Sequence, residues 1–180
     1  QIELHMAKSN VLNTTTATLL DLLGSGKVYS VPAYQRDYSW EEDQWEDLWS
    51  DIEELSNSPD SKHYMGALVV QARTDREFLV IDGQQRIATL SVIALAAISV
   101  IRDLGADPAE KEANRQRATE LRNRFVGEKN PASLVETSKL FLNQTDNEFY
   151  QDYLVQLKEP LNLRKLPKSN RLLWGCFTWF

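Results

Sequence analysis

The pattern of apolar and polar positions predicts several helices around a few short strands. Residues 84–104 are rich in Ala, Leu and Ile and apolar on nearly every side, which is typical of a helix buried in the centre of a domain. Residues 42–55 place apolar side chains on one face and acids on the other. Further helices are expected at residues 15–23 and 108–126, and from about residues 145 and 169 onward.

Capping residues indicate where these helices begin. Ser39 and Glu42 match the S-x-x-E capping box, so the second helix is expected to start there. Asp82 is expected to cap the helix at residues 84–104, and Asp107 caps the helix that follows it.

Three short stretches read as strands. Residues 27–35 contain β-branched and aromatic residues, but Pro32 cannot donate to a ladder, so this strand is either an edge strand or broken at the proline. Residues 63–71 and 77–81 are expected to form a hairpin, and residues 139–143 predict another short strand.

Aromatic residues gather at two places. Trp45 and Trp49 lie on the same side of their predicted helix as Leu48 and Ile52, which favours core packing over a cofactor platform. The final segment, from Ser169, stays strongly apolar to its end. Its side chains need cover, so we expect more protein downstream.

Composition narrows the class of protein. With 180 residues, 42% of them apolar and 26% charged, the chain resembles one soluble domain, or one domain with an appendage. Its single cysteine, Cys176, provides neither a disulfide nor a zinc site, which favours the cytoplasm. The longest apolar stretch, residues 87–101, is too short for a comfortable membrane span. Residues 1–5 lack the features of a signal peptide, and we interpret them as a remnant of expression.

Charge is distributed unevenly along the chain. Residues 41–60 contain nine acidic residues and no basic one, so the remainder carries about +3 against a total of −6. A nucleic-acid partner is therefore not excluded. Two groups of basic residues occur, which we interpret as solvated helix faces and turns. They are Lys111, Arg115, Arg117, Arg122 and Arg124, and Lys158, Arg164, Lys165, Lys168 and Arg171.

A polar pentapeptide, DGQQR at residues 82–86, separates an apolar strand from the buried helix. A helix N-terminus leaves backbone N–H groups unpaired and carries partial positive charge, so it attracts anions. Gly83 lets a ligand approach the backbone, and Arg86 offers a planar fork for phosphate oxygens. Helix capping alone would explain these residues, but it needs neither Gln84 nor Gln85. We therefore favour a phosphate site.

A second polar group, within VPAYQRDYSW at residues 31–40, follows a proline. It combines an aromatic platform, an amide and a guanidinium, which together can stack a base and bind a phosphate. The residues concerned are Tyr34, Gln35, Arg36 and Tyr38. A structural alternative stays open, in which the tyrosines pack and Arg36 pairs with Asp37 or Glu41.

These segments, in their order and spacing, strongly resemble the N-terminal domain of the GmrSD family of type IV restriction enzymes, which also includes SspE-like anti-phage proteins. The resemblance rests on VPAYQRDYSWEEDQWEDLWSDIEEL, HYMGALVVQ and LVIDGQQRIATL. Downstream, KLFLNQTDNEFYQDYL and SNRLLWGCFTWF fit as well, so that it covers residues 28–180. The pair formed by DGQQR and Y-Q-R-x-Y-x-W is much more specific than a lone glycine motif.

The resemblance implies an α+β fold of ParB/sulfiredoxin type, a small sheet with helices in which a nucleotide's phosphates bind at a helix start. This domain would cover residues 6–104. A mainly helical extension would follow at residues 105–180 and stop before a C-terminal nuclease region. In the family, DGQQR is associated with nucleoside triphosphate binding and hydrolysis, for which we expect Mg²⁺, in support of cleavage of modified foreign DNA.

Site residues follow from the same resemblance. The expected catalytic residues are Asp82, Gln84, Gln85 and Arg86, and the expected nucleotide- or phosphate-binding residues are Gly83, Arg86, Tyr34, Gln35, Arg36 and Tyr38. Arg86 would neutralise phosphate charge, and one of the two glutamines would orient water or phosphate oxygens. Asp82 would order the turn or hold a water bound to Mg²⁺. No protein side chains are assigned as direct metal ligands.

DNA cleavage is not assigned to this chain. In full-length relatives that step belongs to a C-terminal His-Asn-His domain, whereas the only histidines here are His5 and His63, and we interpret His63 as structural. The leading hypothesis is a triphosphate-binding and hydrolysing regulatory domain of a modification-dependent restriction or anti-phage endonuclease. The alternatives are a non-catalytic ParB-like DNA-binding module and a protein-interaction module.

Overall fold

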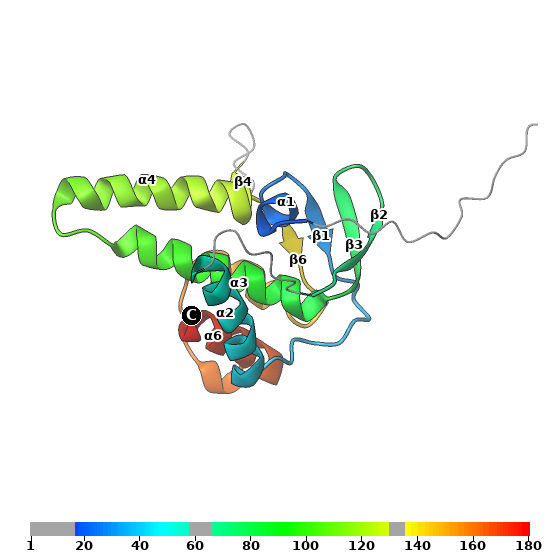
Figure 1. Cartoon of the computed structure of the whole chain (residues 1–180). Helices are drawn as coiled ribbons and strands as arrows, with labels where there is room; N and C mark the ends of the chain where they lie inside the picture. Colours follow the sequence, from blue (N-terminus) through cyan, green and yellow to red (C-terminus); the bar gives the residue numbers. More distant parts are fainter. Residues whose placement is uncertain (1–16, 58–65, 130–135) are drawn as a thin grey trace, which may run out of the picture.

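A small mixed sheet lies at one end of the molecule, in a computed structural model that describes residues 17–57, 66–129 and 136–180 (Figure 1). Its strand order is β2 (Val69–Ala72), β3 (Glu77–Asp82), β1 (Val28–Ser30) and β6 (Leu140–Phe141). Strand β1 runs parallel to both β3 and β6, whereas β2 and β3 form the predicted antiparallel hairpin. The carboxyl ends of β3, β1 and β6 therefore meet at one edge of the sheet.

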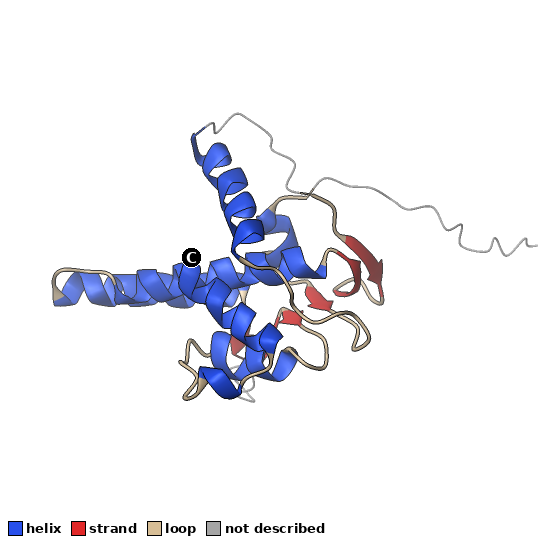
Figure 2. Ribbon diagram, turned by 90° about the horizontal axis from the view of Figure 1, so that it is seen from below, coloured by secondary structure: helices blue, strands red, loops and turns tan. Residues whose placement is uncertain are grey.

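Helix α3 (Gln84–Asp103) starts at that edge and runs through the centre of the molecule, as its nearly uniform apolar surface predicts. It packs against α4 (Pro108–Phe125) and α6 (Lys168–Trp179). Figures 1 and 2 show the end of α3 and the start of α4 projecting together away from the sheet. Helix α2 (Glu42–Asn57) lies beside α6 in both views.

Shorter elements complete the described chain. They are α1 (Leu19–Leu23), a second hairpin of β4 (Gly127–Lys129) and β5 (Glu136–Ser138), α5 (Asn147–Phe149), a π-helical turn at Tyr150–Leu154, and a 3₁₀ turn at Leu163–Lys165. The fold is α+β, as expected, with helices accounting for most of the regular structure.

The capping residue predicted from the sequence is confirmed for α4 and wrong for α2 and α3. Asp107 caps α4 as expected, because its carboxylate accepts the Glu110 N–H at 2.9 Å. The Ser39–Glu42 capping box is wrong, since α2 begins at Glu42 and the Glu41 N–H donates to Gln44 Oε1 at 2.9 Å. The expected cap on α3 is also wrong. The N-cap of α3 is a glycine with no side-chain hydrogen bond, and Asp82 instead ends β3 with an exposed side chain.

Strand β1 lies in the interior of the sheet, so the edge position considered for residues 27–35 is wrong. The alternative, a strand broken at Pro32, is confirmed because β1 ends at Ser30. An interior strand needs N–H groups on both sides, and it can have them here because the proline follows the last paired residue.

The tryptophans of α2 contact the aromatic residues at the end of α6. Trp45 is buried against the core as predicted, with its ring 6.3 Å from that of Trp179. Trp49 is 37% exposed and contacts Phe180, with ring centroids 5.6 Å apart. The apolar end of α6 therefore finds part of its cover on α2.

The expected division near residue 104 stays a prediction. Strand β6, which lies C-terminal to this point, pairs with β1, so the two parts share one sheet. The apolar stretch at residues 87–101 was expected to be too short for a membrane span, but the helix that contains it, α3, is by itself among the described residues long and apolar enough to cross a membrane, and 61% of its apolar window is buried inside the protein. A core helix of a soluble protein passes the same test.

Gly83 joins β3 to α3 with a φ of +88°, a conformation that favours glycine. A Cβ placed there would lie 2.9 Å from Ala67 O and 3.0 Å from a Leu68 side-chain carbon. The close approach of the protein's own backbone is thus sufficient reason for a glycine at this position.

We expect Gly83→Ala to lower the free energy of unfolding by about 2–4 kcal/mol, because it adds backbone strain and a steric conflict. Gly26→Ala is the matched control, since Gly26 has a φ of +71° but nothing lies within 4 Å of its Cβ position. Backbone strain alone gives a loss of about 1 kcal/mol there. Urea denaturation measures both, and equal losses would contradict the steric role of Gly83.

Candidate functional site

The two polar segments identified in the sequence lie against each other at the carboxyl edge of the sheet. Gln85 joins them, with only 5% of its surface exposed. Its Oε1 accepts the Ser39 N–H at 2.8 Å, and its Nε2 donates to Asp37 O at 3.1 Å. Both ends of one buried amide thus bind the backbone of residues 37–39, so Gln85 is satisfied by the protein itself.

The other glutamine of the pair lies at the rim. Gln84 is half-buried, and its Nε2 donates to Gln35 Oε1 at 3.4 Å. Gln35 in turn donates through Nε2 to Ile81 O at 3.0 Å. This chain of amides connects the segment after β1 with the end of β3.

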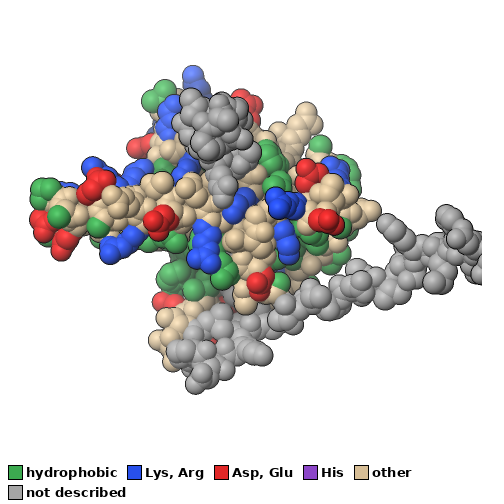
Figure 3. Space-filling model, turned by 90° about the horizontal axis from the view of Figure 1, so that it is seen from above, with side chains coloured by type: hydrophobic (Ala, Val, Ile, Leu, Met, Phe, Trp, Pro, Cys, Tyr) green, Lys and Arg blue, Asp and Glu red, His purple; other side chains and the backbone are tan. Residues whose placement is uncertain are grey.

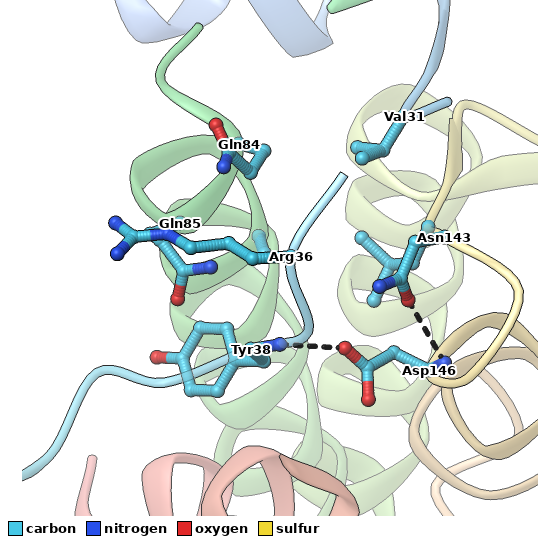
Figure 4. A pocket seen from close by; sticks show the side chains of 9 residues that line it. Val31, Arg36, Tyr38, Gln84, Gln85, Asn143 and Asp146 are labelled. Atoms are coloured by element: carbon cyan, nitrogen blue, oxygen red, sulfur yellow. Dashed lines mark hydrogen bonds between the residues drawn. The ribbon is translucent and has the colours of Figure 1, made fainter. Parts of the chain in front are cut away.

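A third segment, which our sequence predictions of the site did not include, closes the opposite side (Figure 4). Asn143 Nδ2 donates to Gln35 O at 3.0 Å and to Asp37 Oδ1 at 2.7 Å. Asp146 Oδ2 accepts the Tyr38 N–H at 2.7 Å, and the Asp146 N–H donates to Asn143 Oδ1 at 3.0 Å. Polar residues just after the short strand in KLFLNQTD were the available signal, because ligands bind at the carboxyl ends of parallel strands.

A pocket lies between these three segments. Its polar lining comes from Arg36, Gln84, Gln85, Asn143 and Asp146, and its enclosed volume is about 10 Å³. That is room for a single water molecule. A larger ligand would therefore place only a small group in the pocket and lie mostly on the surface around it.

Arg36 is exposed at the mouth of this pocket, with its side chain extended toward the first turn of α3 (Figure 4). Within the described parts of the chain, no hydrogen bond or ion pair to its guanidinium is found. The sequence alternative of a pair with Asp37 or Glu41 is therefore wrong. Asn143 binds Asp37, and Lys168 Nζ lies 3.0 Å from Glu41 Oε1.

The two tyrosines of this segment lie in different environments. Tyr34 is 80% exposed, which leaves its ring open to stacking. Tyr38 is buried, with Oη 2.7 Å from Thr89 Oγ1 and accepting Trp45 Nε1–H at 3.0 Å. Burial raises the pKa of the Tyr38 phenol well above its ordinary value. Tyr38 therefore stays neutral and anchors its segment in the core.

Arg86 does not line the pocket. Its Nη1 donates to Ala67 O at 3.2 Å, and its guanidinium carbon lies 5.8 Å from the centre of the Trp40 ring. A Cβ on Gly66 would lie 2.4 Å from that same carbon. Arg86 thus packs against the backbone of residues 66–67, and among the described residues its guanidinium makes one hydrogen bond, to Ala67 O.

Metal ligands of the usual kind are scarce in this region. Among the residues that the structure describes, no group of three or more His, Cys, Asp or Glu side chains could hold a metal ion. His5 and His63 lie outside the described residues. Carboxylates at the carboxyl edge of the sheet come from Asp37 and Asp82, both exposed, and from buried Asp146.

Comparison with families of known proteins gives one result that covers almost the whole chain. The family described as GmrSD restriction endonuclease, N-terminal domain, matches residues 19–179. That range contains all three segments of the pocket. No curated protein matches the chain.

Asp146 is the carboxylate of the pocket most withdrawn from water, with 2% of its surface exposed. Burial raises its pKa, and the neighbouring Asp37 raises it further, against the opposing effects of Ser169 and the Tyr38 N–H. Its Oδ1 has no hydrogen-bond partner among the described residues. A raised pKa in the folded state means that stability falls as pH rises from the ordinary value of 3.8 toward the raised value.

We expect Asp146→Asn to remove the loss of stability that the wild type shows as pH rises. The amide oxygen still accepts the Tyr38 N–H, but no buried charge forms. At pH 7 its free energy of unfolding should equal or exceed that of the wild type, and below pH 3.8 the advantage should vanish. Chemical denaturation from pH 3 to 7 measures this, with the exposed Asp152→Asn as a control for charge loss. A loss above about 1 kcal/mol at pH 7 would show that the buried charge itself is stabilising.

Proposed function

The chain belongs to the family of GmrSD restriction endonuclease N-terminal domains, and from this premise we propose that it binds and hydrolyses a nucleoside triphosphate. In this proposal it is the regulatory domain of a modification-dependent restriction or anti-phage endonuclease. Family membership supports the restriction role. The triphosphate is the finer step, and it is argued from the pocket.

One observation carries the proposal, namely that the guanidinium of Arg36 lies beside the start of a long helix and has no partner among the described residues. The N-cap of α3 offers no side-chain acceptor to the first-turn N–H groups. An oxyanion at the mouth of the pocket would therefore meet backbone donors, the positive end of the helix and a planar guanidinium. Arg36 lies close to this helix start because Gln85, in the first turn of α3, accepts the Ser39 N–H and donates to the Asp37 carbonyl.

The size of the pocket constrains how a triphosphate binds. Only about 10 Å³ is enclosed, so the base and ribose lie outside on the surface. Tyr34 is exposed on the same segment as Arg36 and can stack a base there. The phosphates are then the part that approaches α3.

Hydrolysis needs a positioned water and compensation of phosphate charge. Gln84 at the rim is the amide that we assign to orienting the water, since Gln85 is occupied by the backbone. Asp82 and Asp37 supply exposed carboxylate oxygens, the ligand type that Mg²⁺ accepts directly or through water. Mg²⁺, when bound with the nucleotide, would neutralise part of the phosphate charge.

Cleavage of DNA is outside this proposal. We propose that a C-terminal His-Asn-His domain of the full-length protein performs it, and that the full-length protein contacts the modified DNA. The domain described here would supply nucleotide-dependent control.

We expect Arg36→Ala to weaken binding of MgATP or MgGTP about 10- to 100-fold, the loss of a charge-assisted hydrogen bond. Arg73→Ala, which removes an exposed arginine from the β2–β3 turn, is the matched control and should leave affinity unchanged. Arg86→Ala tests the other arginine. It should lower the free energy of unfolding by about 1 kcal/mol through loss of the Ala67 and Trp40 contacts.

Isothermal titration calorimetry and phosphate release measure binding and turnover. Absence of triphosphate binding by the wild-type chain would contradict the proposal. Equal affinity in the wild type and Arg36→Ala would remove Arg36 from the site, and a large loss in Arg86→Ala alone would transfer the role to Arg86.

A second candidate function is a DNA-binding module that uses no nucleotide. It is favoured by exposed basic side chains along α4, among them Lys111, Arg115, Arg117 and Arg124. Figure 3 shows such side chains at several points along this helix, with acidic ones between them. The salt dependence of DNA binding distinguishes the two candidate functions. A protein that binds along DNA phosphates loses affinity for DNA steeply as the salt concentration rises, even without nucleotide.

A further inference from the structure

Residues 34–39 carry Arg36 but form neither helix nor strand. An irregular segment lacks the hydrogen bonds of regular structure, so its shape depends on other groups. Side chains from two distant parts of the sequence provide these bonds. Gln85 holds one side, and Asn143 and Asp146 hold the other.

Asn143 binds the residues on either side of Arg36, and Asp146 binds the next residue along the segment. Asn143 Nδ2 donates to the carbonyl of the preceding residue, Gln35, and to the carboxylate of the following one, Asp37. Asp146 accepts the N–H of Tyr38. The Arg36 side chain takes no part in these bonds, so they hold the backbone without occupying the guanidinium.

Asn143 and Asp146, which we call the clamp, are also hydrogen-bonded to each other. The Asp146 N–H donates to Asn143 Oδ1 at 3.0 Å, and both residues are at least 97% buried. A turn at residues 143–146 directly after β6 therefore presents one amide donor pair and one carboxylate in fixed positions. The Asn143 amide and Asp146 Oδ2 are held in place because each binds a fixed backbone or side-chain partner, although Asp146 Oδ1 has none among the described residues.

We propose that Asn143 and Asp146 are positioning residues that hold Arg36 in the geometry for binding a phosphate-bearing ligand. This inference rests on the proposed function and deepens it, because it adds a third segment to the site. Fixing the backbone in the unbound protein removes the entropy loss that ordering the segment on binding would bring. Because Asn143 binds the residues before and after Arg36, loss of these bonds weakens affinity chiefly through Arg36.

A double-mutant cycle with MgATP tests this directly, using Asn143→Ala, Arg36→Ala and the double variant of the whole chain. Asn143→Ala should weaken binding about tenfold when Arg36 is present, and less than about twofold when Arg36 is already alanine. A purely structural effect of Asn143 would be the same in both backgrounds. Gln144→Ala, an exposed residue of the same turn, is the matched control.

Two further measurements test whether Asn143 and Asp146 act by holding the backbone around Arg36. The backbone N–H order parameter of Arg36 should be near 0.85 in the wild type and below about 0.6 in Asn143→Ala. Asp146→Asn should keep wild-type affinity, because an amide oxygen can still accept the Tyr38 N–H, whereas Asp146→Ala should not.

The outcomes are distinguishable. Additive losses in the cycle, or an Arg36 backbone that stays rigid in Asn143→Ala, overturn the positioning role and leave the proposed function intact. A wild-type chain that binds neither MgATP nor MgGTP overturns the proposed function, and with it the ligand-binding purpose of the clamp.

Discussion

The site depends on one buried amide, that of Gln85, bound at both ends to the backbone of residues 37–39. A buried amide that loses a partner costs about 1–3 kcal/mol, so this pair of bonds strongly favours one register between the segment after β1 and the start of α3. The glycine before the helix allows the close contact with residues 67–68 that sets where α3 begins. The start of α3 and residues 34–39 therefore hold each other in place, and the pocket between them depends on both.

This arrangement divides the pentapeptide DGQQR into supporting and exposed parts. Gln85 and Arg86 bind the protein's own backbone, at residues 37–39 and 67, and so shape the site from within. Gln84 and Asp82 face the rim and solvent. The free guanidinium comes from Arg36, on the other segment. Two adjacent glutamines in one motif can thus have different tasks, since adjacent helix residues point in different directions.

The sequence was sufficient for the elements whose pattern is local. Helix α3 and the Asp107 cap of α4 follow from apolar periodicity and from one carboxylate at a helix start. The interior position of β1 and the turn at residues 143–146 depend on pairing between residues more than 100 positions apart, which no local pattern reports. Tyr34 and Tyr38 show the same limit. They share a motif, but only the fold decides that one ring is exposed and the other lies in the core.

The most direct test of this account is native-state hydrogen exchange at the Tyr38 and Ser39 amides. Among the described residues, the acceptors of these two N–H groups are side-chain oxygens of Asp146 and Gln85. If those side chains hold the segment as described, both amides exchange at least about 1,000-fold more slowly than in an unstructured peptide. Exchange at the unstructured rate would show that the segment carrying Arg36 is not held, and the account of the site would be wrong.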